Sequence, residues 1–216
     1  KPNIHANIAV GTNNNPNFGG LIEDHGVVWA YMVNGLNDWI NRDPAYALKF
    51  TARGAIDIEL SFAPASQTMP WVDGYISAYE WPSDYYNFGA CEDCATSGTL
   101  CPQMHFDWTC EKVYRVSYGV LPAWPIPEIY LTNGVNAEQW AWLSRWAIQN
   151  SRSPMHFKGS LTQWQACQTN PPCNGADNRP EQGWAQLYEA LNPYPGCGTC
   201  QELDWATDMK YASSVD

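Results

Sequence analysis

Apolar and polar residues alternate most clearly in the stretch 54–62, which reads Gly-Ala-Ile-Asp-Ile-Glu-Leu-Ser-Phe. A period of two predicts a β-strand, because successive side chains of a strand point to opposite faces of the sheet. The apolar side chains of one face are Ile56, Ile58 and Leu60. Asp57 and Glu59 fall together on the other face. Placing two like charges side by side in a buried strand costs stability, so this pair marks a candidate site.

Strand-like segments of this kind alternate along the chain with segments whose apolar residues recur at helical spacing. The predicted strands cover residues 4–10, 55–60, 84–88, 128–132 and 155–163. The predicted helices cover residues 27–40, 70–79, 111–118, 136–148 and 180–191. Asp24 and Asn136 are candidate N-caps, and Pro70 is a candidate first residue of its helix. The alternation predicts an α/β fold of parallel βαβ units with right-handed crossovers.

Sites in parallel α/β folds form at the carboxyl ends of the strands. Polar residues fall at or near four predicted ends: Asn13, Glu59, Asn87 and Gln163. Glu128 instead lies at the start of its predicted strand, which counts against it. The sequence has no G-x-G-x-x-G and no G-x-x-x-x-G-K-[ST] loop, which disfavours an open nucleotide-binding sheet. These observations favour a (β/α) barrel of the TIM type.

The predicted barrel is short, because eight βα units usually need about 250 residues and only five units are visible in this chain. We therefore expect a reduced or incomplete barrel, which an upstream segment or a second chain would complete. The chain begins with Lys1 rather than Met, so we expect that an upstream segment was removed or lies outside this sequence. Residues 1–192 are expected to form a single domain with a Cys-rich insert at 91–110, and residues 193–216 a Cys-containing tail with little regular structure.

The composition narrows the partners that the protein can have. The net charge is -11 at pH 7, which disfavours nucleic acid and anionic membranes. No apolar run is long enough to span a bilayer. The chain holds 12 Trp and 12 Tyr while only 15% of its residues are charged, a balance typical of secreted proteins that handle sugars. We therefore expect a carbohydrate or polysaccharide partner, although most of the rings can equally belong to the core.

The eight cysteines suggest an oxidising, extracellular compartment. Local pairing would give Cys94–Cys101, Cys91–Cys110, Cys167–Cys173 and Cys197–Cys200, although sequence alone does not fix the connectivity. A four-Cys zinc site in the 91–110 insert and a redox pair in the tail are the alternatives, and disulfides are preferred over both. The four His residues are scattered. We therefore expect neither a metal nor another cofactor.

The tripeptide Asp57-Ile58-Glu59 resembles the Asp-x-Glu signature of lysozyme-like family 25 glycoside hydrolases. More of the chain resembles a group of uncharacterised secreted bacterial proteins with a glycoside-hydrolase-like barrel. The stretches that carry this resemblance are 5–14, 71–75, 127–130, 133–134, 162–167 and 182–184. The resemblance implies a barrel fold and secretion, and it implies no particular reaction.

Glycoside hydrolysis needs two carboxyl groups on either side of the scissile bond. Glu59 is the first candidate for the general acid, because burial in an apolar strand would raise its pKa. Asp57 would assist it, and Glu128 is the alternative partner. The side chains expected to contact sugar are Asn13, Asn87, Tyr130, Gln163 and Trp164. The competing hypothesis is that these acids are bonded to backbone or to His5, in a non-catalytic carbohydrate-binding or surface-assembly protein on a degenerate barrel.

Overall fold

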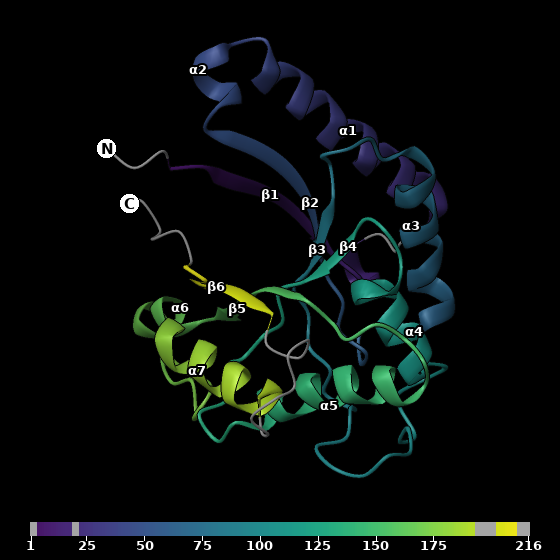
Figure 1. Ribbon diagram of the computed structural model, residues 1–216, viewed down its shortest axis with the longest axis vertical. Helices are drawn as coiled ribbons and strands as arrows, with labels where there is room; N and C mark the ends of the chain where they lie inside the picture. Colours follow the sequence, from purple (N-terminus) through teal and green to yellow (C-terminus); the bar gives the residue numbers. More distant parts are fainter. Residues whose placement is uncertain (1–3, 19–21, 193–201, 211–216) are drawn as a thin grey trace.

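The computed structural model describes residues 4–18, 22–192 and 202–210 (Figure 1). Its strands are β1 (Ala6–Asn13), β2 (Phe50–Asp57), β3 (Tyr85–Asn87), β4 (Ala123–Pro125), β5 (Phe157–Thr162) and β6 (Leu203–Asp208). Its α-helices are α1 (Glu23–Asn41), α2 (Pro44–Ala47), α3 (Ala65–Ala78), α4 (Cys110–Tyr114), α5 (Val135–Gln149), α6 (Trp164–Thr169) and α7 (Pro180–Leu191). A 3-10 turn, Pro16–Phe18, follows β1, and a π-helical segment, Arg115–Gly119, continues α4. The chain is an α/β fold in which parallel strands alternate with helices.

The strands lie side by side in the order in which they occur along the chain. One parallel sheet has the order β1-β2-β3-β4, and a second pairs β5 with β6. The segment after β4 joins the two, because Glu128 bridges to Leu161. In addition, the Ile129 amide donates to the Leu161 carbonyl at 2.8 Å. Strands β1 and β6 are therefore the two free edges, and Figure 1 shows them on the same side of the molecule with the curve open between them.

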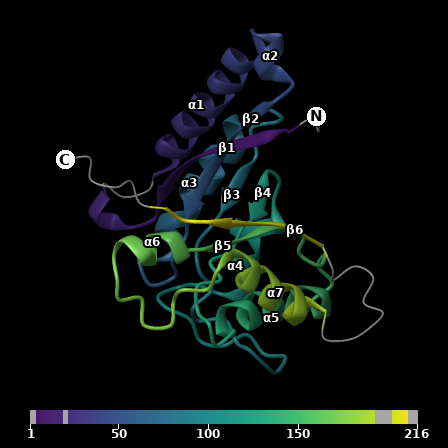
Figure 2. The ribbon, with the colours of Figure 1, turned by 90° about the vertical axis from the view of Figure 1, so that its left-hand side faces the viewer.

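The helices cover the outer side of the curved sheet (Figures 1 and 2). Helices α1 and α3 touch through glycines, because a Cβ on Gly26 would lie 2.0 Å from the Trp71 carbonyl oxygen. The largest buried side chains of the core between helices and sheet are Trp71, Tyr75, Tyr85, Trp140, Trp142 and Phe157. A smaller apolar cluster, Ala55, Tyr86, Ile126 and Leu161, lies on the inner side of the curve. Both faces of the sheet thus carry buried apolar side chains, as is usual for parallel sheets.

Two predicted strands are displaced in the structure. The strand predicted at 55–60 ends at Asp57, so Glu59 lies beyond its end rather than inside it. The strand predicted at 128–132 is wrong, because the sheet residues are Ala123–Pro125, within a segment whose prolines argued for a loop. This second correction matters for the site. Glu128 follows the carboxyl end of β4 and does not precede a strand.

Several helix ends also differ from the predictions. Helix α3 begins at Ala65 and contains Pro70, which therefore does not open it. Asp24 lies in the first turn of α1, where Ile22 holds the N-cap position. Gly134 precedes α5, and the Asn136 side chain instead accepts the Leu131 amide at 2.9 Å. The helix predicted at 180–191 is confirmed as Pro180–Leu191. The tail was expected to have little regular structure, but its residues 203–208 form β6.

Three disulfides join six of the cysteines in the described residues. The predicted Cys167–Cys173 bond is confirmed. The two pairings predicted within the insert, Cys94–Cys101 and Cys91–Cys110, are wrong. The structure pairs Cys91 with Cys94, because a tight turn brings the Cys94 amide to the Cys91 carbonyl at 2.8 Å. It pairs Cys101 with Cys110 at the start of α4. The predicted Cys197–Cys200 bond lies outside the described residues. Disulfides are typical of an oxidising compartment. Among the described helices, none has the length and apolarity needed to cross a bilayer.

Candidate functional site

Three carboxyl groups converge at the carboxyl end of the parallel sheet. Oxygens of Asp57, Glu59 and Glu128 all lie within 4.8 Å of one another, and all three residues are half-buried. Asp57 is the last residue of β2, Glu59 follows two residues later, and Glu128 follows β4 by three residues. All three were catalytic candidates from the sequence, and the structure brings them together, although the sequence placed Glu128 at the wrong end of its strand. The spacing would let one cation contact all three oxygens, so the expectation of no metal stays a prediction.

Glu92 is a fourth acid at this site, and sequence reasoning missed it. It sits in the Cys-rich insert, where its Oε1 accepts the Ser61 amide at 2.7 Å. Its backbone carbonyl accepts the side-chain amide of Gln139 at 2.7 Å. The loop that carries Glu92 approaches β2 closely, since a Cβ on Gly89 would lie 2.1 Å from the Ile58 oxygen. The glycine and the turn-forming Cys91-x-x-Cys94 were the only signals of this placement in the sequence.

Burial and mutual repulsion raise the pKa of each acid in the trio. Burial, followed by the negative charge of Glu92, raises the pKa of Asp57 to about 6. The same two causes, with the charge of Asp57 added, raise the pKa of Glu59 to about 8. Burial, then Glu59 and Asp57, holds the pKa of Glu128 well above its ordinary value. The side-chain contact between Glu59 and Glu128 raises the pKa of Glu128 and lowers that of Glu59, so the two carboxyls titrate together.

Two carboxylate oxygens of the site are buried without a hydrogen-bond partner in the described part of the chain. They are Asp57 Oδ1 and Glu92 Oε2. Unsatisfied buried oxygens cost free energy, and they call for an explanation in terms of function or a bound species. No Lys or Arg forms an ion pair with any of the four acids within residues 4–18, 22–192 and 202–210. The site is therefore an uncompensated negative centre.

Two neighbouring polar side chains fix the acids in place. Asn14 is buried and clasps the backbone of Glu59, donating to its carbonyl at 2.9 Å and accepting its amide at 3.1 Å. The sequence analysis named Asn13 and missed Asn14, although the two are adjacent. The Tyr130 hydroxyl donates to Glu128 Oε1 at 2.7 Å. Tyr130 was expected to contact sugar, which stays a prediction, and in the structure its hydroxyl binds an acid.

The remaining predicted substrate contacts do not converge on the acids as free side chains. Asn87 is 1% exposed, and its amide donates to Ser117 at 2.8 Å while its oxygen accepts the Gly89 amide. Asn13 accepts the Asn15 amide in a turn. Gln163 donates to the Ala176 carbonyl at 2.9 Å. Trp164 is half-buried at the start of α6. The three amides hold turns and packed loops in the structure, and contact of these residues with sugar stays a prediction.

A cavity of about 570 Å³ lies on the inner side of the curved sheet. Its walls come from every strand region, including Asn7 of β1, Tyr86 of β3 and Trp205 of β6. Ala55 and Ile126 line it, and the acids Asp57 and Glu128 follow these two residues at a spacing of two. Because side chains two apart share a face of extended chain, the acids continue the same inner surface.

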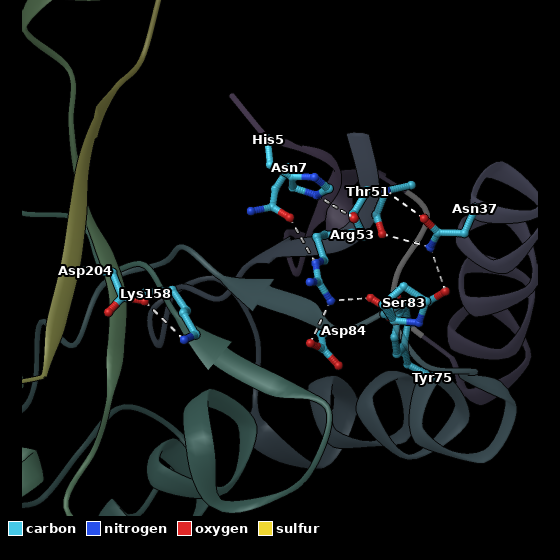
Figure 3. A network of polar contacts seen from close by, with 12 residues as sticks. His5, Asn7, Asn37, Thr51, Arg53, Tyr75, Ser83, Asp84, Lys158 and Asp204 are labelled. Carbon is cyan, nitrogen blue, oxygen red and sulfur yellow. Dashed lines mark hydrogen bonds and ion pairs between the residues drawn. The ribbon is translucent and has the colours of Figure 1, made fainter. Parts of the chain in front are cut away.

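The opposite, amino end of the sheet carries charged residues that are paired with one another (Figure 3). Arg53 donates to Asp84 at 2.7 Å, to the Pro82 carbonyl and to the Asn7 side chain. Lys158 contacts Asp204 at 3.1 Å, and its ammonium lies 4.5 Å from the ring centroid of Trp124. His5, which was the candidate partner of the buried acids, instead contacts the Thr51 hydroxyl at 2.8 Å at this end.

Comparison of the chain with family models, with curated proteins and with solved structures found no match.

Proposed function

We propose that the protein is a secreted glycoside hydrolase that cleaves a polysaccharide by two-carboxylate acid/base catalysis. The observation that carries the proposal is the convergence of Asp57, Glu59 and Glu128 within 4.8 Å at the carboxyl end of a parallel sheet. Catalytic acids of α/β folds lie at this end. The resemblance of Asp57-Ile58-Glu59 to the family 25 signature agrees with this assignment. We further propose that the curved sheet is part of a (β/α) barrel.

The pKa values suggest a division of labour among the acids. At pH 7 a carboxyl with a pKa of about 8, as for Glu59, keeps its proton, and one with a pKa of about 6, as for Asp57, is ionised. A proton donor beside a carboxylate is the pairing that glycoside hydrolysis requires. In this proposal Glu59, which titrates together with Glu128, protonates the leaving oxygen. Asp57 stabilises the positive charge that develops on the sugar or attacks it as the nucleophile.

The spacing also bears on the stereochemistry of the reaction. Carboxyl groups about 5–5.5 Å apart are typical of retaining enzymes, and groups about 6.5–9.5 Å apart leave room for the water of an inverting one. The oxygens of the trio lie within 4.8 Å. We therefore propose retention of the anomeric configuration, with one of the two remaining carboxylates as the nucleophile.

The test is release of reducing ends from a panel of bacterial cell-wall and plant polysaccharides. Glu59→Gln and Glu128→Gln should each lower turnover by about 10²–10⁴-fold, the usual contribution of a positioned acid or base. Glu189→Gln is the matched control, because Glu189 is an exposed Glu in the last turn of α7. Turnover by Glu59→Gln equal to that of the control would remove Glu59 as the acid. NMR of the first product would distinguish retention from inversion.

The second candidate function is a non-catalytic carbohydrate-binding or surface-assembly protein. The observation that favours it is the cavity on the inner side of the curved sheet, whose wall includes the rings of Tyr86, Phe88 and Trp205. Flat rings suit the apolar faces of sugars. Calorimetric binding of a polysaccharide that the wild-type protein never cleaves, weakened by Trp205→Ala, would support this function over hydrolysis.

A further inference from the structure

Strands β1 and β6 are both edges of the sheet, and both are unusually exposed. No residue of β1 is buried, and Asn7, Ile8 and Ala9 are exposed although their side chains alternate between the two faces. In β6, Asp204, Trp205 and Ala206 are likewise exposed. Parallel strands are normally covered on both faces and paired on both sides. Within the described residues, the two edges therefore lack neighbours that their type of sheet normally has.

The cavity shows that the two edges face a common gap. It is lined at one border by His5 and Asn7 at β1 and at the other by Trp205 and Thr207 of β6. Both edge strands run in the same direction, since every pairing among the described strands is parallel. A parallel barrel usually closes at about eight strands, so six strands in sequential order leave room for roughly two more.

Helix α1, which follows β1, carries an apolar surface that stays partly exposed in the described structure. We call the residues Val28, Tyr31, Met32, Leu36 and Trp39 the α1 stripe. They lie on a different face of the helix from Gly26, Ala30 and Val33, which are buried against α3 and the sheet. Tyr31 is 62% exposed and Trp39 is 57% exposed. A helix that is apolar on both faces is typical of one that is buried all round.

This surface is as large as the largest apolar patch that a typical monomer exposes. An aromatic side chain offers roughly 150–250 Å², so the two rings of the α1 stripe alone leave roughly 250 Å² in water. With its aliphatic members and Ile8 of β1, the apolar area is on the order of 500 Å². The largest patch on a typical monomer is about 300–600 Å² and is often functional. One side of a stable interface buries about 800 Å², to which an edge strand adds its unpaired backbone.

We propose that about two further strand–helix units of the same polypeptide pair with β1 and β6, cover the α1 stripe and close the sheet into a barrel. Only units of this kind offer a parallel strand to each edge together with an amphipathic helix for the stripe. A second copy related by a two-fold axis would present β1 antiparallel to β1 and would leave β6 open. The carboxyl ends of the added strands would complete the wall of the acid site. The proposal does not depend on catalysis.

The test compares the 216-residue chain with the complete product of its gene by hydrogen exchange and light scattering. In the complete product, amides of β1 should exchange at least about 10²-fold more slowly than in the 216-residue chain, because edge pairing protects them. Trp39→Glu should lower the melting temperature of the complete product. Leu100→Glu is the matched control, since Leu100 is 85% exposed in the Cys-rich insert and should tolerate a charge.

Three results would overturn the proposal. One is equal exchange of β1 amides in both forms, or a complete product without additional strand–helix units. Another is a Trp39→Glu variant of the complete product that is no less stable than Leu100→Glu. The third is a dimer of the 216-residue chain with protected β1 amides, which would assign the surface to a second copy.

Discussion

The two ends of one parallel sheet differ in whether their charged side chains are paired. At the amino end, the guanidinium of Arg53 meets Asp84 and two further oxygens, and Lys158 meets Asp204. At the carboxyl end, Asp57, Glu59 and Glu128 gather with Glu92 and have no cationic partner in the described structure. The amino end lowers the cost of burial by pairing charges. At the carboxyl end no cation among the described residues offsets the free-energy cost of burying the acids. Acid clusters of this kind are common at functional sites.

The largest expected effect comes from breaking the paired end. Arg53→Met should lower the free energy of unfolding by about 2–3 kcal/mol, because it leaves the carboxylate of Asp84 half-buried without its partner. Both side chains of this pair are less than one-fifth exposed. Arg152→Met, which breaks an exposed pair with Glu111, is the control and should cost about 0.5 kcal/mol or less. Equal losses in urea unfolding would contradict the view that the amino end is a stabilising network.

Removing a charge at the other end should have the opposite sign. Glu59→Gln should raise the free energy of unfolding by about 1–2 kcal/mol at pH 8, since it removes a carboxylate that burial and the neighbouring acids disfavour. The pKa of Glu59 is 4.5 ordinarily and about 8 in the folded chain, so the unfolded chain loses this proton first as pH rises. Wild-type stability therefore falls between about pH 4.5 and 8, and the gain of the variant should vanish near pH 4. If the gain in the free energy of unfolding persisted at pH 4, ionisation of Glu59 could not be its cause.

A smaller effect is expected for the hydroxyl that holds Glu128. Tyr130→Phe should cost about 1 kcal/mol, the usual value of a hydrogen bond. It should also raise the pKa of Glu128 further, because the hydroxyl that is removed stabilises the ionised carboxyl in the wild type. Carboxyl ¹³C NMR would follow that titration, with Tyr188→Phe on α7 as the control. A downward movement of the pKa would show that Tyr130 does not stabilise the carboxylate.

The smallest effect is expected at Asp57, whose pKa rises from 3.8 to about 6 on folding. Asp57→Asn should gain about 0.5–1 kcal/mol above pH 6, less than Glu59→Gln, because the new amide also needs a partner at the unpartnered Oδ1 position. The gain should disappear as the pH falls from 6 to below 4, where both states are protonated. Melting temperatures across this range would check the window. If Asp57→Asn were less stable than the wild type at pH 7, the folded chain would stabilise the Asp57 carboxylate rather than disfavour it.

Local patterns in the sequence were enough to predict the class of fold and most of the acid site. Period-two alternation around Ile56 and the helical pattern at 180–191 correspond to β2 and α7. The position of Asp57 and Glu59 near the end of a strand followed from the same alternation. These features depend on neighbours within a few residues, which is why one sequence suffices to find them.

Features that depend on distant segments were missed. Strand β4 has only three residues, and its Ala-Trp-Pro carries no strand pattern of its own, so its pairing with β3 decides it. Glu92 reaches the site because the Gly89 loop packs on Ile58, about thirty residues away in the chain. The connectivity of Cys91, Cys94, Cys101 and Cys110 likewise follows from the path of the insert, and spacing alone allowed other pairings.

The hydrogen bonds that Asn14 makes to the backbone of Glu59 leave the site sensitive to deamidation. Deamidation would turn the Nδ2 donor of Asn14 into a carboxylate oxygen, which would then face the Glu59 carbonyl that it now holds at 2.9 Å. Attraction would become repulsion, and a further negative charge would enter a centre that already has four acids. Peptide mapping of stored protein should therefore show that the melting temperature falls as the fraction of chains modified at Asn14 rises.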